Sequence, residues 1–397
     1  MSHQSLHCSR RQFLRLSAAI AAGGPLALSR PSAIFADVPR ARTDAKVAIV
    51  HCGNYGPEMR TALKEAFDLL GGIGSLVKNK TVTVKLNLTG FDFAPVCKRP
   101  AGESYVTHFS TALALGGLLF DAGARRVRFV ESTQVRASLE ATLRLGEWDL
   151  QALNALGPVE FENTRNLGKG SKYAEMKVPD GGRMFSRFLV NHSYDETDVL
   201  VSLCKLKEHV TTGVTLSMKN LFGVTPNSLY GDEAPCEDAT AGRGVLHAGK
   251  PWAPNARPPE LPGMILKPSE QPADPGVRVP RIVTDIIAAR PIHLAIIEGV
   301  SAMTGGEGPW TQPAKEQRLV KPGVIIAGLN PVSTDAVGAA VMGVADPRVP
   351  RFNGPVSVSE NHILLAEKAG LGVADLARID VRGLAIEKAR CPYSAKG

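Results

Sequence analysis

The segment DVLVSLCKLKEHVTTGVTLSMKN, residues 198–220, joins an apolar run to a cluster of polar side chains. Its first part, residues 198–204, predicts a buried strand. Three lysines, a histidine and an asparagine follow within residues 205–220. A lysine loses rotamer freedom when it is fixed and costs free energy when it is desolvated. Lysines beside a core element are therefore either splayed into water or directed at an anion.

Similar apolar runs recur along the chain, and helical periodicity lies between them. Helical spacing occurs, for example, at residues 58–70, 108–123, 334–343 and 360–370. This alternation predicts βαβ units, and therefore an α/β fold with a largely parallel or mixed sheet and helices on both faces. The predicted strands are residues 46–52, 81–88, 126–132, 158–163, 198–204, 291–299, 323–329 and 378–384.

Residues 226–280 interrupt the alternation. They hold 11 of the 28 prolines and little hydrophobic periodicity. Such a segment indicates a Pro-rich insertion, either a lid or a wrapping arm, rather than a second domain. We therefore expect a single α/β domain over residues 37–397 that carries this insertion.

The composition is that of an ordinary soluble globular protein. The chain has 397 residues, of which 44% are hydrophobic and 6% aromatic, and its formal net charge is +8. Residues 1–36 contribute four arginines and no acid, which leaves 42 basic and 38 acidic residues, a net charge of +4. This small excess, without a lysine/arginine block or a nucleic-acid-binding motif, argues against a nucleic-acid partner.

The first 36 residues resemble a bacterial twin-arginine (Tat) export signal. Arg10 and Arg11 precede Phe13 and Leu14, and a weakly hydrophobic Ala/Gly stretch follows that is too interrupted for a transmembrane helix. The alternative is an amphipathic start of the domain. The resemblance implies the Tat translocase as a partner, cleavage after Ala36, a periplasmic location and no stable membrane span after cleavage.

The cysteines do not form a metal-binding pattern. Removal of the signal leaves an odd number, and none are spaced as C-x-x-C, so the sequence argues against a zinc ribbon or an iron–sulfur cluster. Disulfides are permitted in an oxidising compartment, but at least one thiol must stay free or pair between chains. The five cysteines are Cys52, Cys97, Cys204, Cys236 and Cys391.

Polar residues follow five of the predicted strands. In open parallel sheets, ligands bind beyond the carboxyl ends of the strands. A polar residue after any single strand needs no explanation, because strands must lead into polar loops. Five such residues, with acids and lysines so close to buried runs, favour a binding site. These residues are Asn87, Glu131, Lys205, Glu298 and Asn330.

The second predicted strand carries a lysine inside its buried run. In TVTVKLN, residues 81–87, Thr83, Lys85 and Asn87 share one face by the strand period of two, and the aliphatic residues take the other face. Lys85 is therefore expected to lie along a polar face of an otherwise buried strand.

The polar part of the opening segment predicts an anion site. If residues 205–209 are extended, Lys205, Lys207 and His209 point to one side, and Thr211 or Thr212 caps a helix that runs to about Gly223. A helix N-terminus flanked by lysines suits a carboxylate, phosphate or sulfate. The alternative is a solvated face. We favour the anion site because apolar residues between 214 and 222 bury the other side of the helix.

Two further segments are expected to contribute to the same site. Glycines in GVSAMTGGEGPW, residues 299–310, permit positive φ and close backbone approach to a ligand, although a plain surface loop explains them equally well. In residues 330–347, Ser333 or Thr334 is expected to cap a helix with Asp335 in its first turn, where Asp335 is either a capping acid or part of the site.

A series of short motifs resembles the DUF362 family of uncharacterised proteins, in matching order from about residue 46 to residue 384. The resemblance implies the fold and the location of the site, but no agreed reaction. Phe109 stands where many relatives have proline, Glu208 where many have threonine, and the ferredoxin-like cysteine tail of many members is missing. The motifs are K-x-N at 85–87, T-H at 107–108, K-x-K-x-H at 205–209, T-x-x-x-K-N-x-x-G at 215–223, G-E-G-P at 306–309, P-x-x-x-D-A-V at 331–337 and G-x-x-D-P at 343–347.

Two functions follow as hypotheses. The first is a periplasmic enzyme that acts on a small anionic substrate, and the second is a non-catalytic anion- or cofactor-binding protein with the same pocket. A divalent metal is the weaker option for a cofactor, because no metal-ligand spacing is present. The expected catalytic residues are His209, Lys207, Glu298 and Asp335; the expected substrate-binding residues are Lys85, Asn87, Lys205, Thr215, Lys219, Asn220, Gly306 and Gly308; and the metal candidates are His108, Glu131 and Glu298.

Overall fold

The computed structural model describes residues 45–393, except residues 91, 241, 254, 312, 313 and 356. The expected export signal at residues 1–36 lies outside the described residues. Within the described part of the chain, no helix combines the length and the apolar character that crossing a bilayer requires.

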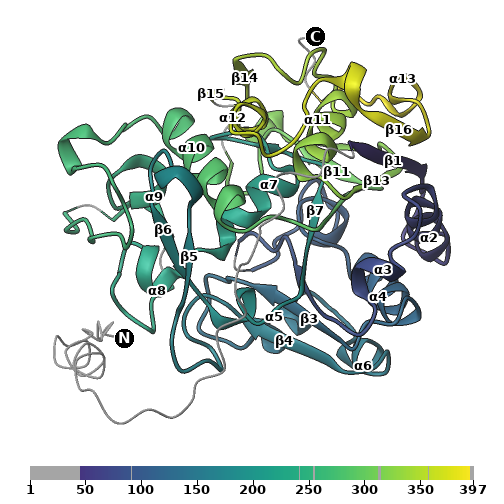
Figure 1. Cartoon of the computed structure of the whole chain (residues 1–397), viewed down its shortest axis with the longest axis horizontal. Helices are drawn as coiled ribbons and strands as arrows, with labels where there is room; N and C mark the ends of the chain where they lie inside the picture. The colour runs from purple at the N-terminus through teal and green to yellow at the C-terminus, as the bar shows by residue number, and fades with distance from the viewer. Residues whose placement is uncertain are drawn as a thin grey trace.

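Eight of the apolar runs form one central sheet, as predicted (Figure 1). Each run is bounded by turn or loop residues. The six inner strands are almost entirely buried, which is typical of strands covered on both faces, whereas the two edge strands are partly exposed. In spatial order the strands are β16 (Asp380–Gly383), β1 (Lys46–His51), β13 (Val324–Gly328), β10 (Leu294–Gly299), β7 (Val199–Lys205), β2 (Thr81–Lys85), β3 (Arg126–Glu131) and β4 (Val159–Asn163).

The sheet is mixed because one strand runs against the others. β13 pairs antiparallel with both β1 and β10, whereas all other neighbouring strands are parallel. The ends of β2, β3, β7 and β10 therefore lie at one edge of the sheet. Asn330, which follows β13, lies at the opposite edge, since Gly328 pairs with Ala295 near the start of β10.

Alternating side chains of the strands build a hydrophobic core on each face of the sheet. Ile296 of β10 belongs to the core under α2 (Glu58–Leu69) and α4 (Phe109–Asp121), whereas the next residue, Ile297, belongs to the opposite core. Each fully buried aliphatic side chain contributes about 1.5–3 kcal/mol to folding. The opposite core packs under α7 (Leu216–Asn220), α10 (Pro275–Ala289), α11 (Pro331–Val341) and α12 (His362–Lys368) (Figure 1).

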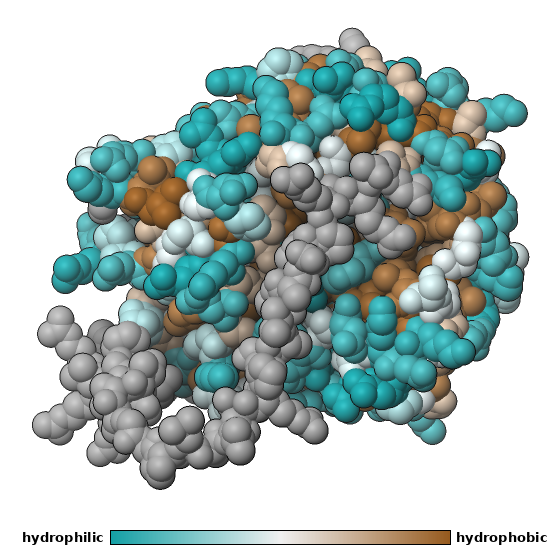
Figure 2. Space-filling view, viewed as in Figure 1, coloured by the Kyte–Doolittle hydropathy of each residue, from teal (hydrophilic) through white to brown (hydrophobic). Residues whose placement is uncertain are grey.

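Shorter elements surround the sheet. Residues 226–280 contain two short helices and the start of α10, with irregular backbone between them. The exposed face in Figure 2 is mainly hydrophilic, with hydrophobic residues in separate patches. The shorter elements are α3 (Gly74–Val77), α5 (Leu139–Leu145), α6 (Leu150–Asn154), α8 (Asn227–Tyr230), α9 (Gly244–Ala248), α13 (Ile386–Ala389), and the antiparallel pairs β5 (Ala174–Lys177) with β6 (Arg187–Val190), β8 (Glu208–His209) with β9 (Gly213–Val214), β11 (Ala302–Thr304) with β12 (Arg318–Val320), and β14 (Arg351–Asn353) with β15 (Val358–Glu360).

The helix predicted from Thr211 or Thr212 is shorter than expected. Residues 208–214 form the β8–β9 hairpin, which is closed by Gly213 at φ 73°, a conformation that glycine tolerates best. The helix α7 begins only at Leu216. The expected capping threonines therefore lie in the hairpin, and a side chain from another element replaces them, as described below.

The cap of α11 also differs from the prediction. Asn330 is its N-cap, and the Asn330 side chain accepts a hydrogen bond of 3.0 Å from the Ser333 amide. Because Pro331 takes the first helical position, the cap lies before it, and Ser333 and Thr334 already belong to the helix.

Candidate functional site

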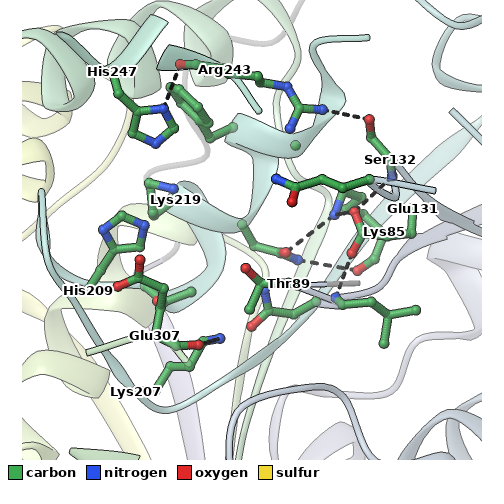
Figure 3. Close-up of a pocket in the computed structure, with 18 of the residues that line it drawn as sticks. Lys85, Thr89, Glu131, Ser132, Lys207, His209, Lys219, Arg243, His247 and Glu307 are labelled. Atoms are coloured by element: carbon green, nitrogen blue, oxygen red, sulfur yellow. Dashed lines mark hydrogen bonds and ion pairs between the residues drawn. The ribbon is translucent and has the colours of Figure 1, made fainter. Parts of the chain in front are cut away.

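A cavity of about 270 Å³ opens at the sheet edge where β2, β3 and β7 end (Figure 3). Its walls also come from the β8–β9 hairpin, from α7, from residues 243–252 and from the loop between β11 and β12. The lining includes four basic side chains. The charged and aromatic lining residues are Lys85, Lys207, Lys219, Arg243, His209, His247, Glu131, Glu307, Phe222, Trp252 and Trp310.

Some of the residues predicted to form the site line this cavity, and others do not. Two members of the expected catalytic set, Glu298 and Asp335, do not line it, and the two expected glycines flank the lining residue Glu307 without lining the cavity themselves. The predicted residues that line the cavity are Lys85, Asn87, Glu131, Lys207, His209, Thr215, Lys219 and Asn220; those that do not are Lys205, Glu298, Asp335, His108, Gly306 and Gly308.

Lys85 and Glu131 form a buried ion pair on one wall of the cavity. The Lys85 ammonium contacts Glu131 and donates a hydrogen bond of 2.7 Å to the Leu86 carbonyl. Glu131 also accepts hydrogen bonds from the amides of Leu88, at 2.6 Å, and Ser132, at 2.9 Å. Burial lowers the pKa of Lys85, and Glu131 opposes that shift. These two charges therefore compensate each other and hold the ends of β2 and β3 together.

Of the described lysine and arginine side chains that line the cavity, Lys219 alone has neither an ion pair nor a hydrogen bond. Its side chain is only 8% exposed, and its ammonium lies 4.5 Å from the centre of the Phe222 ring. Among the described residues, nothing accepts a hydrogen bond from this ammonium or forms an ion pair with it. Burial lowers the Lys219 pKa to about 7, which Glu307 opposes and Arg243 reinforces.

Lys207 reaches the same space from the segment after β7. Its ammonium donates to the carbonyls of Tyr105, at 2.5 Å, and Glu307, at 3.0 Å. Burial lowers the Lys207 pKa to about 7, with Glu307 acting in the opposite direction and Lys219 in the same one. One Glu307 carboxylate oxygen accepts from the Val210 amide at 3.0 Å, which ties the β11–β12 loop to the β8–β9 hairpin.

His209 is a neutral imidazole whose Nδ1 atom is occupied. That atom accepts a hydrogen bond of 3.1 Å from the Thr211 amide, so it carries no proton. The proton of the neutral ring is therefore on Nε2. Burial lowers the His209 pKa well below its usual value, and the charge of Lys219 adds to this shift. His209 accordingly offers a hydrogen-bond donor at Nε2.

His247 has the opposite tautomer. Its Nδ1 atom lies 2.8 Å from the Arg243 carbonyl oxygen, and a carbonyl can only accept, so Nδ1 carries the proton. Burial and Lys219 lower the His247 pKa to about 3, which leaves Nε2 as an unprotonated acceptor. Figure 3 shows Lys219 between the rings of His209 and His247. One cavity thus contains an imidazole donor and an imidazole acceptor beside an unpaired lysine.

Arg243 anchors the 226–280 segment at the cavity. Its guanidinium donates to the Thr225 carbonyl at 2.7 Å, the Ser132 hydroxyl at 2.6 Å and the Asn227 side chain at 2.8 Å. These contacts join α8 and α9 to the end of β3. His247 follows one turn later on α9, so the arginine also sets the position of the imidazole.

Lys205 and Glu298 belong to a separate network beside the cavity. They form an ion pair of 2.6 Å, with both side chains fully buried. The Tyr55 hydroxyl donates to Glu298 at 2.7 Å and accepts from Lys205 at 2.7 Å. Because β7 and β10 are parallel neighbours, Lys205 and Glu298 are directly paired at their ends. The network connects these strands to the loop after β1.

Asp335 caps α7. Its carboxylate accepts from the Ser217 amide at 2.8 Å, the Met218 amide at 2.9 Å and the Ser217 hydroxyl at 2.5 Å. It replaces the threonine cap expected from the sequence. The amides expected to bind an anion at this helix N-terminus are therefore occupied by Asp335.

The metal candidates are distributed over two networks. His108 caps α4 and stacks on Tyr55 with 3.7 Å between ring centres, so it lies near Glu298, whereas Glu131 pairs with Lys85. Across residues 45–393, apart from the six positions named above, no group of three or more histidine, cysteine, aspartate or glutamate side chains is arranged to hold a metal ion.

Several lining residues were not expected from the sequence. Glu307 lies within the quoted G-E-G-P motif, so its loop was expected but not its side chain. Residues 226–280 lack periodicity, and no local pattern indicates that this segment reaches the sheet edge. The unexpected charged and aromatic residues are Arg243, His247, Trp252, Glu307 and Trp310.

Comparison with protein families identifies the family of this chain. A family model described as a domain of unknown function, DUF362, matches residues 82–340. No curated protein matches the chain. The matched range begins at β2 and ends in α11, and it includes all the residues that line the cavity.

Proposed function

We propose that this chain, which belongs to the DUF362 family, is an enzyme that binds a small anionic substrate in the cavity and acts on it by acid–base chemistry. The observation that carries the proposal is the Lys219 ammonium, which belongs to a residue only 8% exposed and faces the cavity without a hydrogen-bond acceptor among the described residues. A buried charge that lacks a partner costs free energy, and a bound carboxylate, phosphate or sulfate removes that cost.

The balance of charges supports an anion rather than a cation. Lys85 and Glu131 compensate each other. Among the other charged lining residues that the structure describes, Lys207, Lys219 and Arg243 are basic, whereas Glu307 is the single acid. The cavity lining therefore has an excess of positive charge, which a substrate with one or two negative charges balances.

The two imidazoles supply the acid–base chemistry in this proposal. The unprotonated Nε2 of His247 is the base, and its Nδ1–H bond to the Arg243 carbonyl holds it in that tautomer. His209 donates from Nε2 to the oxygen atom on which negative charge develops. The lysines hold the anionic group, and an ionised ligand also raises the histidine pKa values toward the working range.

A binding protein without turnover is the second candidate. It is favoured by the lowered pKa of both histidines, because neither is then a protonated acid near neutral pH. In that case the imidazoles only complete the hydrogen bonding of a bound anion or anionic cofactor.

One experiment separates the two candidates. Purified protein is incubated in D₂O with a set of small carboxylates, phosphate esters and sulfate esters, and NMR follows both conversion and exchange of carbon-bound protons. Calorimetry measures binding of the same compounds. Binding with conversion or exchange supports the enzyme, binding alone supports the second candidate, and no binding overturns the anion site. Lys219→Met is the control, and it should weaken binding in either case.

We further propose that the protein is exported through the Tat pathway and works in the periplasm as one α/β domain over residues 37–397. The support is the paired Arg10 and Arg11 followed by an acid-free apolar stretch ending near Ala36.

A further inference from the structure

Two exposed tryptophans lie at the cavity. Trp252 is 57% exposed and Trp310 is 42% exposed, and both line it. They come from segments far apart in the sequence, the loop after α9 and the β11–β12 loop. Large aromatic side chains are normally buried, because each contributes a large apolar area. Two exposed indoles at one polar cavity therefore require an explanation.

Both indoles are held in position by close packing on glycine backbone. A Cβ atom at Gly90 would lie 2.6 Å from the Trp310 ring, and a Cβ atom at Gly242 would overlap the Trp252 ring. Trp310 also packs edge-on against Tyr105, with 5.7 Å between ring centres. The Trp252 ring lies 5.2 Å from that of His247. Each indole therefore packs against the protein on one side, while much of its remaining surface is exposed.

The charges at the cavity decide what these faces can bind. Two specific partners of an aromatic face are a cation and another flat ring. A cationic group would be repelled by Lys207, Lys219 and Arg243, which already exceed the acidic residues beside them. A flat ring that carries a negative group satisfies both parts of the site, because the ring packs on indole and the anion meets Lys219.

We propose that the ligand of this cavity is an aromatic anion, with its carboxylate or phosphate at Lys219 and its ring against Trp252 and Trp310. The inference rests on the proposed anion site and names the class of compound that the site takes. The volume of about 270 Å³ limits the ligand to a small aromatic compound, because pockets for drug-sized ligands occupy roughly 300–1,000 Å³.

Calorimetry with matched probes tests this class. Benzoate is compared with cyclohexanecarboxylate, which has a similar size but no flat ring, and phenyl phosphate is compared with inorganic phosphate and glucose 6-phosphate. The wild-type protein should prefer the aromatic member of each set. The carboxylate and phosphate sets also show which anionic group the site favours.

Variants of each tryptophan test whether its indole causes the preference for an aromatic probe. Trp252→Leu and Trp310→Leu should each reduce the preference for the aromatic probe by about 2- to 10-fold, while affinity for inorganic phosphate stays within about twofold because the lysines are intact. Trp252→Phe and Trp310→Phe keep a flat ring and should retain most of the preference. Leu145→Ala is the control, since Leu145 is 64% exposed and does not line the cavity.

The outcomes separate this inference from the proposed function. If the anions bind but a flat ring makes no difference, or if glucose 6-phosphate binds best, the aromatic ligand is wrong and the anion site stands. If no probe binds, both proposals fail. Circular dichroism of each variant establishes that it is folded, and the phenylalanine variants provide the same comparison if a leucine variant does not fold.

Discussion

The ammonium nitrogen of Lys205 lies 2.6 Å from a carboxylate oxygen of Glu298, and both side chains are completely buried. Lys219 comes from the same short stretch of sequence and is also buried, but it has no acidic or carbonyl partner in the described part of the chain. Because the charge of Lys205 is paired with Glu298, it contributes to the stability of the fold. The unpaired charge of Lys219 is available to a ligand.

Substitution of these two lysines should therefore change stability in opposite directions. Lys205→Met leaves Glu298 as a buried unpaired charge and should lower the free energy of unfolding by about 3–5 kcal/mol. Lys219→Met removes a buried unpaired charge and should raise it by about 1–3 kcal/mol. Urea denaturation at pH 7 without added anions measures both. Equal losses in the two variants would contradict the distinction.

Anion binding should be coupled to proton uptake. Burial lowers the pKa values of Lys207 and Lys219 to about 7, so both are partly deprotonated at pH 7. A bound anion raises both values, so binding at pH 7 should take up about one proton in total. Affinity should be nearly constant below pH 7 and should fall as the pH rises above it, because the free lysines then lose their charge.

Calorimetry in two buffers with different ionisation enthalpies measures this proton uptake directly. Lys219→Met serves as the matched variant, and its remaining uptake should be about half that of the wild type. A constant affinity between pH 6 and pH 9, with no proton exchange, would show that the lysines do not hold the anion.

The histidine tautomers predict different outcomes for similar substitutions. Asparagine at position 247 keeps a donor near Nδ1 for the Arg243 carbonyl but removes the base at Nε2, so His247→Asn should lower turnover by about 10²- to 10⁴-fold. Substrate affinity should change little. His209→Gln places an amide donor near the original Nε2–H and should retain more activity than His209→Asn. Steady-state kinetics on the compound identified by NMR checks this order, and equal activity of the two His209 variants would remove its proposed role as a donor.

We expect Asp335 to stabilise the fold rather than to take part in catalysis. Asp335→Ala removes the acceptor of the Ser217 and Met218 amides at the start of α7 and should lower the free energy of unfolding by about 3 kcal/mol. Asp335→Asn keeps one oxygen acceptor and should cost less. Chemical denaturation gives both values. A fully stable Asp335→Ala protein that no longer turns over substrate would instead place Asp335 in the chemistry.

Export should depend on the arginine pair itself. Replacement of Arg10 and Arg11 by lysine conserves the charge but removes the feature that the Tat pathway recognises. The precursor should then remain in the cytoplasm. Cell fractionation and immunoblotting measure this, with Arg15→Lys as the matched variant outside the pair. Normal accumulation of the double variant in the periplasm would contradict a Tat signal.

The sequence determined the central sheet because the information for each strand is local. An apolar run such as residues 81–85 predicts a strand by its own alternation, and all eight predicted runs became strands of the sheet. The same alternation correctly separated Lys85 from Val82 and Val84, which lie in the core beneath α2 and α4. The resemblance to the DUF362 family was likewise readable from short motifs.

Tertiary structure decided which polar residues meet. β13 runs antiparallel to its neighbours, so Asn330 lies at the edge opposite the cavity although its local sequence resembles that of the other strand ends. Lys205 and Lys207 are two positions apart, but only Lys207 lines the cavity, because Glu298 of the neighbouring strand pairs with Lys205.

The remaining walls come from residues 226–280 and from the β11–β12 loop, which bring Arg243, His247, Trp252 and Trp310 to the ends of β2 and β3. Nothing in the periodicity of these segments specifies their destination. Their positions depend on contacts between residues far apart in the chain, such as Arg243 with Ser132 and Trp310 with Gly90. Local sequence patterns report the burial and conformation of a segment, whereas these pairings arise only when the packed sheet brings distant segments together.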